Sequence, residues 1–180
     1  TGAPKAIELA KASMVASAKA TGECFDLKPG TTALLCISTD YIGGKMMLVR
    51  ALILGWKLDV QAPVSNPLEH TNKIYDFAAL VPMQLHQSLN KIHHVKKLLV
   101  GGGVVSESLI AAIQSVPTKI YASYGMTETV SHIAVKALNH LRGGSVSYFK
   151  TLPNIKVSKD ERDCLVIQAP LLSKNPIITN

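Results

Sequence analysis

The spacing of hydrophobic residues changes repeatedly along the first two thirds of the chain, from helical periodicity to short continuous apolar runs. Ile7, Ala10, Met14 and Ala18 recur at intervals that place them near one face, which predicts a helix over residues 7–19. The same change of period recurs in later segments and predicts elements that alternate. Strands are expected at 32–37, 57–61, 77–81, 97–100 and 119–122, and helices at 42–54, 67–75, 83–89 and directly after Ser106.

This alternation of strands and helices predicts an α/β fold. Strands that alternate with helices are joined by right-handed crossovers, so the sheet should be mainly parallel with helices on its faces. Ligands of such sheets bind beyond the carboxyl ends of the strands. Gly101–Gly103 and Tyr124–Gly125 both follow predicted strands, so the topology places both segments where a ligand would lie.

The character of the sequence changes after about residue 137. Short apolar segments at 145–149, 154–157 and 164–168 are separated by turns rich in Gly, Pro and Asp, which predicts short antiparallel strands. We therefore expect two regions, an α/β region over residues 1–137 and a β-rich subdomain over residues 138–180.

The composition is that of a globular protein. The chain has 180 residues, of which 47% are hydrophobic and 17% charged, so it can bury a sizeable core. No apolar run approaches the ~20 residues that cross a bilayer, and the first residues lack the features of a secretory signal. Cys24, Cys36 and Cys164 are too few and too far apart for a disulfide framework or a Cys-x-x-Cys metal site, which favours a reducing cytoplasm.

The positive net charge of the chain reduces the number of possible partner classes only in part. A net charge of +7 and an isoelectric point near 9.4 are compatible with nucleic acid, an acidic membrane surface or anionic small molecules. The lysines and arginines are scattered, aromatic residues make up only 5%, and no nucleic-acid-binding motif is present, so we expect no DNA or RNA partner. A Gly-x-Ser-x-Gly nucleophile motif is also missing, which argues against a hydrolase.

Two glycine-containing segments have the composition of loops that bind phosphates or nucleotides. In Thr1-Gly2-Ala3-Pro4-Lys5, small side chains would let backbone amides approach a phosphate, and the lysine would add positive charge. Gly101-Gly102-Gly103 lies between a predicted strand and a predicted helix and would admit a flat purine or a phosphate. The alternatives are a terminal turn for the first segment and a turn with only a packing role for the second.

The segment from Ser123 to Thr129 carries the side chains best suited to nucleotide chemistry. Tyr124, which precedes a glycine, can stack on adenine, and the hydroxyl of Thr127 can bond a phosphate. The carboxylate of Glu128 can bind Mg²⁺, a hard cation that prefers oxygen ligands. The alternative is that the tyrosine belongs to the core and that Thr127 and Glu128 only end a strand.

In this order along the chain, the three motifs resemble those of the adenylate-forming superfamily of acyl-CoA synthetases, luciferases and peptide-synthetase adenylation domains. The resemblance implies that Thr127 binds the α-phosphate of ATP and Glu128 binds Mg²⁺, which makes them the expected catalytic residues. The other implied nucleotide contacts are Thr1, Gly2 and Lys5 at the phosphates and Gly101, Gly102, Gly103, Tyr124 and Gly125 at adenine. Ala6 departs from the superfamily, which usually has Gly there.

A second group of residues aligns with the acyl pocket of the superfamily. Tyr41 stands where many relatives have His, and Arg50 follows nine residues later, where its planar guanidinium would suit a carboxylate. Ser131 and His132 fall in a region that lines this pocket in relatives. The alternatives are a solvent-exposed Arg50 on a helix surface and a purely structural His132.

The run from Tyr124 to His132, together with Arg50, most resembles the o-succinylbenzoate-CoA ligases of menaquinone synthesis, whose substrate carries two carboxylates. The resemblance implies that ATP and a carboxylate form an acyl-adenylate and that CoA then displaces AMP. The expected cofactors and partners are therefore ATP, Mg²⁺, CoA and a small-molecule carboxylate, and family habit adds a homodimer. The alternatives are another acyl- or aryl-CoA ligase and a non-enzymatic nucleotide-binding module.

The last residues, Ile177–Asn180, resemble the strand that precedes the ribose-binding Asp of the superfamily. That Asp, and the C-terminal domain that supplies a catalytic Lys, would lie beyond this sequence. We therefore expect the chain to be part of the N-terminal domain of a longer enzyme and to be inactive by itself.

Overall fold

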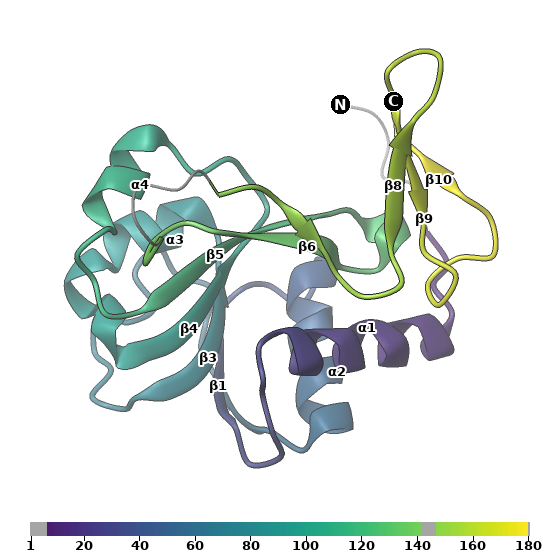
Figure 1. Cartoon of the computed structure of the whole chain (residues 1–180). Helices are drawn as coiled ribbons and strands as arrows, with labels where there is room; N and C mark the ends of the chain where they lie inside the picture. The colour runs from purple at the N-terminus through teal and green to yellow at the C-terminus, as the bar shows by residue number, and fades with distance from the viewer. Residues whose placement is uncertain (1–6, 142–146, 180) are drawn as a thin grey trace.

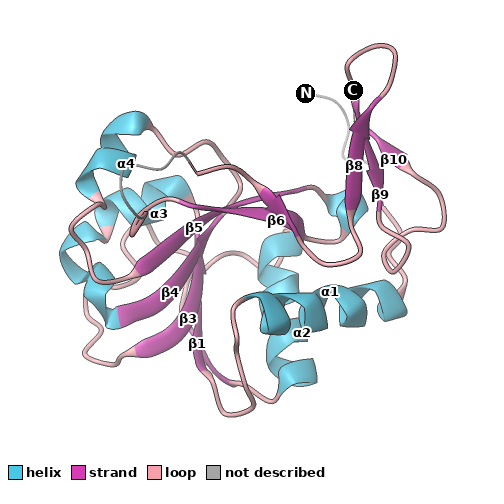
Figure 2. Ribbon diagram, in the orientation of Figure 1, coloured by secondary structure: helices cyan, strands magenta, loops and turns pink. Residues whose placement is uncertain are grey.

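A computed structural model describes residues 7–141 and 147–179, which form a seven-stranded sheet flanked by helices and a three-stranded sheet (Figures 1 and 2). The larger part contains α1 (Lys11–Cys24), β1 (Thr32–Leu35), α2 (Ile42–Leu54), β2 (Lys57–Val60), β3 (Tyr75–Leu80), α3 (Pro82–Gln87), η1 (Leu89–His94), β4 (Val95–Val100), α4 (Glu107–Ala112), β5 (Lys119–Gly125), η2 (Thr127–Thr129), β6 (His132–Ala137) and β7 (Lys150–Thr151). The smaller sheet contains β8 (Lys156–Lys159), β9 (Leu165–Gln168) and β10 (Ile177–Ile178).

The strands of the large sheet follow the order β2-β1-β3-β4-β5-β6-β7. The pairs from β2 to β5 are parallel, whereas β6 and β7 extend the sheet in antiparallel fashion. The predicted α/β fold with a mainly parallel sheet and a short antiparallel segment is therefore confirmed. Because the central strands are parallel, the carboxyl ends of β1, β3, β4 and β5 meet at one edge of the sheet.

Helices cover both faces of this sheet, because successive strand residues point to opposite sides. Leu34 of β1 packs into one cluster with Leu85 of α3 and Leu109 of α4. Its neighbour Leu35 packs into a second cluster with Met47 of α2. Figure 2 shows α3 and α4 on one side of the strands and α2 on the other.

Helix α1 packs on α2 and runs across it (Figure 1). Ala18 of α1 and Met46 of α2 are fully buried in one cluster, and Val130, from the loop before β6, completes it. The loop before β6 is thereby held against both helices. Among the described residues, no helix has the length and apolar character needed to cross a membrane.

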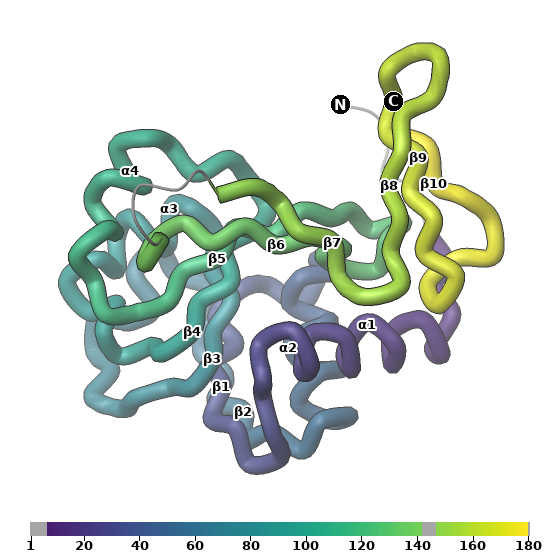
Figure 3. Tube along the Cα trace, viewed as in Figure 1, coloured from purple at the N-terminus to yellow at the C-terminus, as the bar shows by residue number. Residues whose placement is uncertain are grey.

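The small antiparallel sheet lies beside the start of β6 (Figure 3). Ile167 of β9 is fully buried against Ile133 of β6, so the two sheets share a small hydrophobic core. The predicted strands at 154–157 and 164–168 correspond to β8 and β9, displaced by one or two residues. The predicted strand at 145–149 falls partly outside the described residues.

One local prediction was wrong, and one strand was not predicted at all. The expected helix over 67–75 is absent: these residues form turns, and Tyr75 already begins β3. The side chain of Thr71 accepts a hydrogen bond from the backbone N–H of Lys73, a local bond that competes with helix formation. Strand β6 was not predicted, and it owes its form to its antiparallel pairing with β5.

Two predicted helix boundaries are confirmed. Gly55 follows α2 with a φ of 68° and donates its N–H to the carbonyl oxygen of Ala51, so it ends the helix in the left-handed conformation that favours glycine. Ser106 precedes α4, and its hydroxyl accepts a hydrogen bond from the N–H of Leu109 at 3.3 Å.

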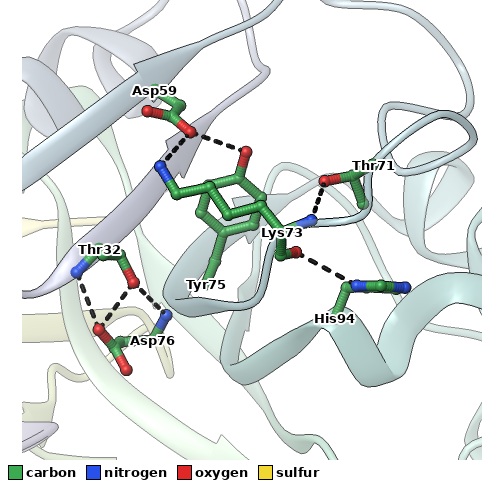
Figure 4. Close-up of polar contacts among 7 residues, drawn as sticks. All are labelled: Thr32, Asp59, Thr71, Lys73, Tyr75, Asp76 and His94. Atoms are coloured by element: carbon green, nitrogen blue, oxygen red, sulfur yellow. Dashed lines mark hydrogen bonds and ion pairs between the residues drawn. The ribbon is translucent and has the colours of Figure 1, made fainter.

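Polar contacts tie β1, β2 and β3 together (Figure 4). The carboxylate of Asp76 accepts hydrogen bonds from the backbone N–H and the hydroxyl of Thr32, at 2.9 and 2.8 Å. Asp59 of β2 accepts bonds from Lys73 and from the hydroxyl of Tyr75, at 2.6 and 3.0 Å. These bonds fix the long connection between β2 and β3.

Candidate functional site

A cavity of about 540 Å³ opens where the parallel strands end. Its walls come from the segments that follow β1, β3, β4 and β5, and from α2 and α3. The lining residues are Ile37, Ser38, Tyr41, Ile42, Gly43, Gly44, Arg50, Pro63, Val64, Ala79, Leu80, Val81, Met83, Gln84, Leu99, Gly101, Gly102, Ser123, Gly125, Met126, Thr127, Ser131 and His132. The cavity thus lies at the strand ends where the sequence predicted a ligand site.

Close backbone contacts define the wall formed by the loop after β1 and the start of α2. A Cβ on Gly44 would stand 2.2 Å from the carbonyl oxygen of Ser38, so only glycine allows the helix to approach this loop. Tyr41, directly before the helix, lines the cavity while 75% of its surface remains exposed. The Gly43-Gly44 pair therefore shapes the wall, and Tyr41 lies at its open side.

Strand β5 delivers the predicted nucleotide motif to the opposite wall. Gly125, Met126 and Thr127 line the cavity, and the short helix η2 carries Glu128 at the surface. The hydroxyl oxygen of Thr129 accepts the N–H of Met126 at 2.9 Å and lies 2.8 Å from the carbonyl oxygen of Ser131. The side chain of Thr129 thus fixes both ends of this loop.

The backbone turns sharply at Val130, between the nucleotide motif and β6. Its φ of 66° and ψ of −49° are rare for a β-branched residue, and the side chain is fully buried. The N–H of Ser131 donates to the carbonyl oxygen of Thr129 at 2.7 Å, which closes a γ-turn around Val130. Strained backbone of this kind persists where the surrounding structure enforces it, often at functional sites.

Arg50 of α2 reaches the cavity from a buried position. Only 2% of its surface is exposed, and its partners are uncharged: the hydroxyl of Thr21 at 3.1 Å, the hydroxyl of Ser131 at 2.6 Å and Nδ1 of His132 at 3.4 Å. Burial lowers the pKa of Arg50 to about 10, so the guanidinium stays protonated at neutral pH. None of the ion pairs among the described residues involves it.

His132, the first residue of β6, is held neutral beside this cation. Burial, and secondarily the charge of Arg50, lowers the pKa of His132 to about 3. Because Nδ1 faces the N–H of Arg50 and the hydroxyl of Ser131, the proton of the neutral ring belongs on Nε2. Nε2 is buried and has no hydrogen-bond partner among the described residues.

The charge on the described lining of the cavity is positive. Arg50 is the one Lys, Arg, Asp or Glu side chain among the lining residues that the structure describes. A buried cation without a carboxylate partner is costly, and an anionic ligand would supply the missing counter-charge. The arrangement is therefore suited to a substrate that places a carboxylate or phosphate near Arg50.

The structure brings together most, but not all, of the residues predicted for the site. Those that line the cavity are Tyr41, Arg50, Gly101, Gly102, Gly125, Thr127, Ser131 and His132. Gly103 and Glu128 lie next to lining residues, and Tyr124 packs edge-on against Phe149 with ring centroids 6.1 Å apart. Thr1, Gly2 and Lys5 lie outside the described residues. The contacts of Tyr124 and Glu128 with a nucleotide remain predictions.

Sequence reasoning did not select several polar residues of the cavity wall. Gln84 is 3% exposed; its amide nitrogen donates to the carbonyl oxygens of Cys36 and Val64, and its amide oxygen accepts the N–H of Val81. In the sequence it looks like an ordinary polar position of a helix, because its partners are distant backbone groups. Ser123 likewise bonds to a distant backbone group, the carbonyl oxygen of Val100, whereas Ser38 bonds with Asp40, two residues along the chain.

The residues present fit a magnesium nucleotide. Glu128 is exposed and makes no hydrogen bond or ion pair with another described residue, so its carboxylate oxygens are accessible to a cation. In the described part of the chain, no group of three or more His, Cys, Asp or Glu side chains could hold a metal by itself. A magnesium ion here would therefore need further oxygen ligands, such as phosphates or water.

The fold and cavity define an α/β protein with a ligand-sized cavity at the carboxyl ends of its parallel strands, and comparison with known sequences gives its family. The chain belongs to the AMP-binding enzyme family, whose model matches residues 1–166. A 2-succinylbenzoate-CoA ligase from Staphylococcus aureus strain MSSA476 is 27% identical over 172 residues. The alignment covers 91% of this chain and 35% of that protein, so the chain spans about a third of the length of this relative.

Solved structures agree with this family. An AMP-forming acyl-CoA synthetase/AMP-acid ligase II-like protein from Dyadobacter fermentans is 41% identical and superposes with a TM-score of 0.90. The superposition covers 100% of this chain and 54% of that chain. O-succinylbenzoate coenzyme A synthetase from Bacillus subtilis, in complex with ATP and magnesium, superposes with a TM-score of 0.84 over 98% of this chain and 40% of that chain. At 18% identity, the second similarity concerns the fold alone.

Proposed function

We propose that the complete protein is an AMP-forming acid-CoA ligase. It would first join a carboxylate to the α-phosphate of ATP, with release of pyrophosphate, and would then transfer the acyl group to the thiol of CoA with release of AMP. The observation that carries this proposal is the single cavity lined both by the nucleotide motif at Gly125–Thr127 and by the buried cation Arg50. Two anions can meet there, the α-phosphate from one wall and the acid from the other.

The nucleotide wall would hold ATP. The first residues Thr1, Gly2 and Lys5 would contact its phosphates, and the hydroxyl of Thr127 would donate to the α-phosphate. Glu128 would ligate Mg²⁺, which when bound neutralises phosphate charge during attack by the carboxylate. Adenine would lie against the glycine turn after β4 and beside Tyr124, whose ring would need to turn away from Phe149 to stack on the base.

The opposite wall would bind the acid, and we assign o-succinylbenzoate as this substrate. Arg50 would pair with the carboxylate that does not react, leaving the other to attack ATP, while Tyr41, Ser131 and His132 would line the acyl group. The uncompensated charge of Arg50 and the absence of acidic side chains from the described lining support a substrate with two carboxylates. The name of the Staphylococcus relative supports the same choice.

Several parts of this proposal concern the longer protein. The step with CoA and full adenylation would need a C-terminal domain with its catalytic Lys, so the 180-residue chain alone would be inactive. The complete enzyme would act in the cytoplasm, in menaquinone synthesis, and would form a homodimer. Acyl-CoA formation by the 180-residue chain would contradict the first of these expectations.

Carboxylate-dependent exchange between ATP and pyrophosphate tests the function. The complete protein would be assayed with o-succinylbenzoate, benzoate, a medium-chain fatty acid and an amino acid. We expect exchange with o-succinylbenzoate only, its loss in Glu128→Ala, and its retention in Glu107→Ala, which removes an exposed carboxylate in the first turn of α4. Exchange with a different acid would keep the ligase class and discard the substrate, and no exchange with any acid would favour a nucleotide-binding module.

A further inference from the structure

The guanidinium of Arg50 is clamped between two helices and the loop before β6. Its Nε donates to the hydroxyl oxygen of Thr21 in α1, and its Nη2 lies 2.6 Å from the hydroxyl of Ser131. We propose that Thr21 is a positioning residue which, by holding Arg50 in one orientation, makes the cavity select acids that carry a second carboxylate. This inference rests on the proposed function and extends it to a residue outside the cavity lining.

The polarity of the Thr21 hydroxyl is fixed, so it can only accept from Arg50. Its hydrogen is donated to the carbonyl oxygen of Ser17 at 3.0 Å, one turn earlier in α1. The oxygen lone pairs therefore face Nε of Arg50, and the side chain is fully buried, with no exposed surface. A buried acceptor with one available partner sets the direction of that partner closely.

The other end of the guanidinium is held from the opposite side. The Nη2 atom lies within hydrogen-bond distance of Ser131 and close to Nδ1 of His132, at 2.6 and 3.4 Å. The Nη1 atom has no hydrogen bond to another described residue and is not among the fully buried polar atoms that lack a partner. Because Arg50 lines the cavity, Nη1 is the edge of the fork that remains for a ligand.

This division of the five N–H groups decides which ligand fits. A carboxylate binds a guanidinium strongly only when it lies in the plane of the fork, so the plane must be set before the ligand arrives. Thr21 and Ser131 set it from two ends, and neither neutralises the charge. Without the acceptor at Thr21, Nε would be left buried and unpaired, and the guanidinium would rotate to find another partner.

The predicted consequence is specific to one carboxylate of the substrate. Loss of the Thr21 hydroxyl should weaken the binding of o-succinylbenzoate. It should not affect 4-oxo-4-phenylbutanoate, which keeps the ring, the keto group and the reacting carboxylate of the succinyl arm but has hydrogen in place of the ring carboxylate, the one assigned to Arg50. A general loss of packing would instead weaken both acids and ATP alike. The ratio of the two affinities therefore separates positioning from a merely structural role.

The test uses the complete protein and measures calorimetric affinities of the two acids in the wild type, Thr21→Val and Thr21→Ser. The Val variant keeps the shape but removes the acceptor, and the Ser variant keeps the hydroxyl. Because a bond to a charged group contributes about 1.5–3 kcal/mol, we expect the Val variant to bind o-succinylbenzoate at least tenfold more weakly, with 4-oxo-4-phenylbutanoate unchanged. The Ser variant should stay within about threefold of the wild type.

A second variant keeps the inference falsifiable if Thr21→Val fails to fold. Ser131→Ala removes the acceptor at the other end of the fork, and Ser131 is only half buried, so the same selective loss is expected there. If Thr21→Val folds and keeps the wild-type ratio of affinities, the inference is overturned. If Thr21→Val does not fold, an unchanged ratio in Ser131→Ala overturns it.

Failure of the proposed function gives a different pattern. A wild type that prefers the dicarboxylate, and loses this preference in Thr21→Val, but shows no pyrophosphate exchange would refute the ligase and keep the positioning role. A wild type that exchanges pyrophosphate with an acid but binds the two probes equally would keep the ligase and refute the role of Thr21. In an active enzyme, Thr21→Val should raise KM for o-succinylbenzoate about tenfold and leave KM for ATP unchanged.

Discussion

Gly125 lies directly against the main chain of Ser131: a Cβ on the glycine would stand 2.2 Å from the carbonyl oxygen of Ser131. That oxygen lies 2.8 Å from the hydroxyl of Thr129, so the loop is held in place. We expect Gly125→Ala to cost about 1–3 kcal/mol of stability, as overpacking does in well-packed sites, and to weaken acid binding by displacing Ser131. Urea unfolding and acid affinity check these two effects.

Gly103→Ala is the matched control for this substitution. The atoms nearest to a Cβ at Gly103 belong to the side chain of Pro82, at 3.5 and 3.7 Å, which is ordinary van der Waals contact. We expect a change in the free energy of unfolding within about 0.5 kcal/mol. If both alanine variants are destabilised equally, the close contact between Gly125 and Ser131 is not the cause of the loss at Gly125.

The γ-turn at Val130 predicts that a glycine variant is more stable than an alanine variant there, which is the reverse of the usual order. Any residue with a Cβ is strained at a φ of 66°, and glycine is not. In ordinary backbone, by contrast, alanine makes the folded protein more stable than glycine does. Both Val130→Gly and Val130→Ala remove a fully buried side chain, so both should destabilise the protein. We expect the Gly variant to be the more stable of the pair by about 1 kcal/mol.

The same pair of substitutions at Val135 serves as the comparison. Val135 is half buried in β6, and its backbone is not among the described residues with positive φ. There we expect Val135→Ala to be more stable than Val135→Gly, by about 0.5–1 kcal/mol. If the Ala variant is more stable than the Gly variant at both positions in unfolding experiments, the backbone at Val130 is not strained in solution.

The course of the large sheet could be predicted because apolar periodicity and strand-end glycines are local signals. Helix α2 illustrates this, since Gly55 ends it as expected. The helix predicted over 67–75 failed because its buried apolar residues lie in separate elements: Pro67 and Leu68 belong to a turn, and Tyr75 begins β3. Apolar spacing cannot distinguish such anchors from one helical face.

The motifs of the candidate site could be predicted from the sequence, but most residues that hold its side chains in place could not. Arg50 lies four residues after Met46 and three after Met47, both fully buried, so helical spacing alone could have placed it on the inner face of α2. Thr21 and Gln84 had no such signal. Each is a polar residue in a helical segment, and its role comes from a partner 29 or 48 residues away.

Gln84 should contribute strongly to the stability of the cavity wall. Its amide satisfies the carbonyl oxygens of Cys36 and Val64 and the N–H of Val81, at 2.8, 2.9 and 3.2 Å. Gln84→Met keeps the volume but leaves three backbone groups without this partner, so we expect a loss of about 2–4 kcal/mol. Gln87→Met, an exposed position of the same helix, should change stability by less than about 0.5 kcal/mol. Equal effects at the two positions in urea unfolding would contradict this assignment.

The neutral state of His132 predicts how stability depends on pH. Its pKa in the folded protein is lowered to about 3, by burial and then by Arg50, whereas an unperturbed histidine titrates near 6.5. Between these values the unfolded chain binds one more proton than the folded one, so stability is full above pH 6.5 and falls as the pH is lowered. From pH 7 to pH 5 this group should remove up to about 2 kcal/mol.

A variant without the imidazole isolates this contribution. His132→Gln cannot take up a proton, so its stability should change less than that of the wild type between pH 7 and pH 5. Asp76, whose pKa is lowered to about 2 chiefly by Lys96, titrates below this window and does not interfere. The difference between the two pH profiles, measured by urea unfolding, gives the effect of His132 directly. Parallel profiles would mean that the ring is hydrated and protonates normally, and the polar cluster around Arg50 would then be open to water.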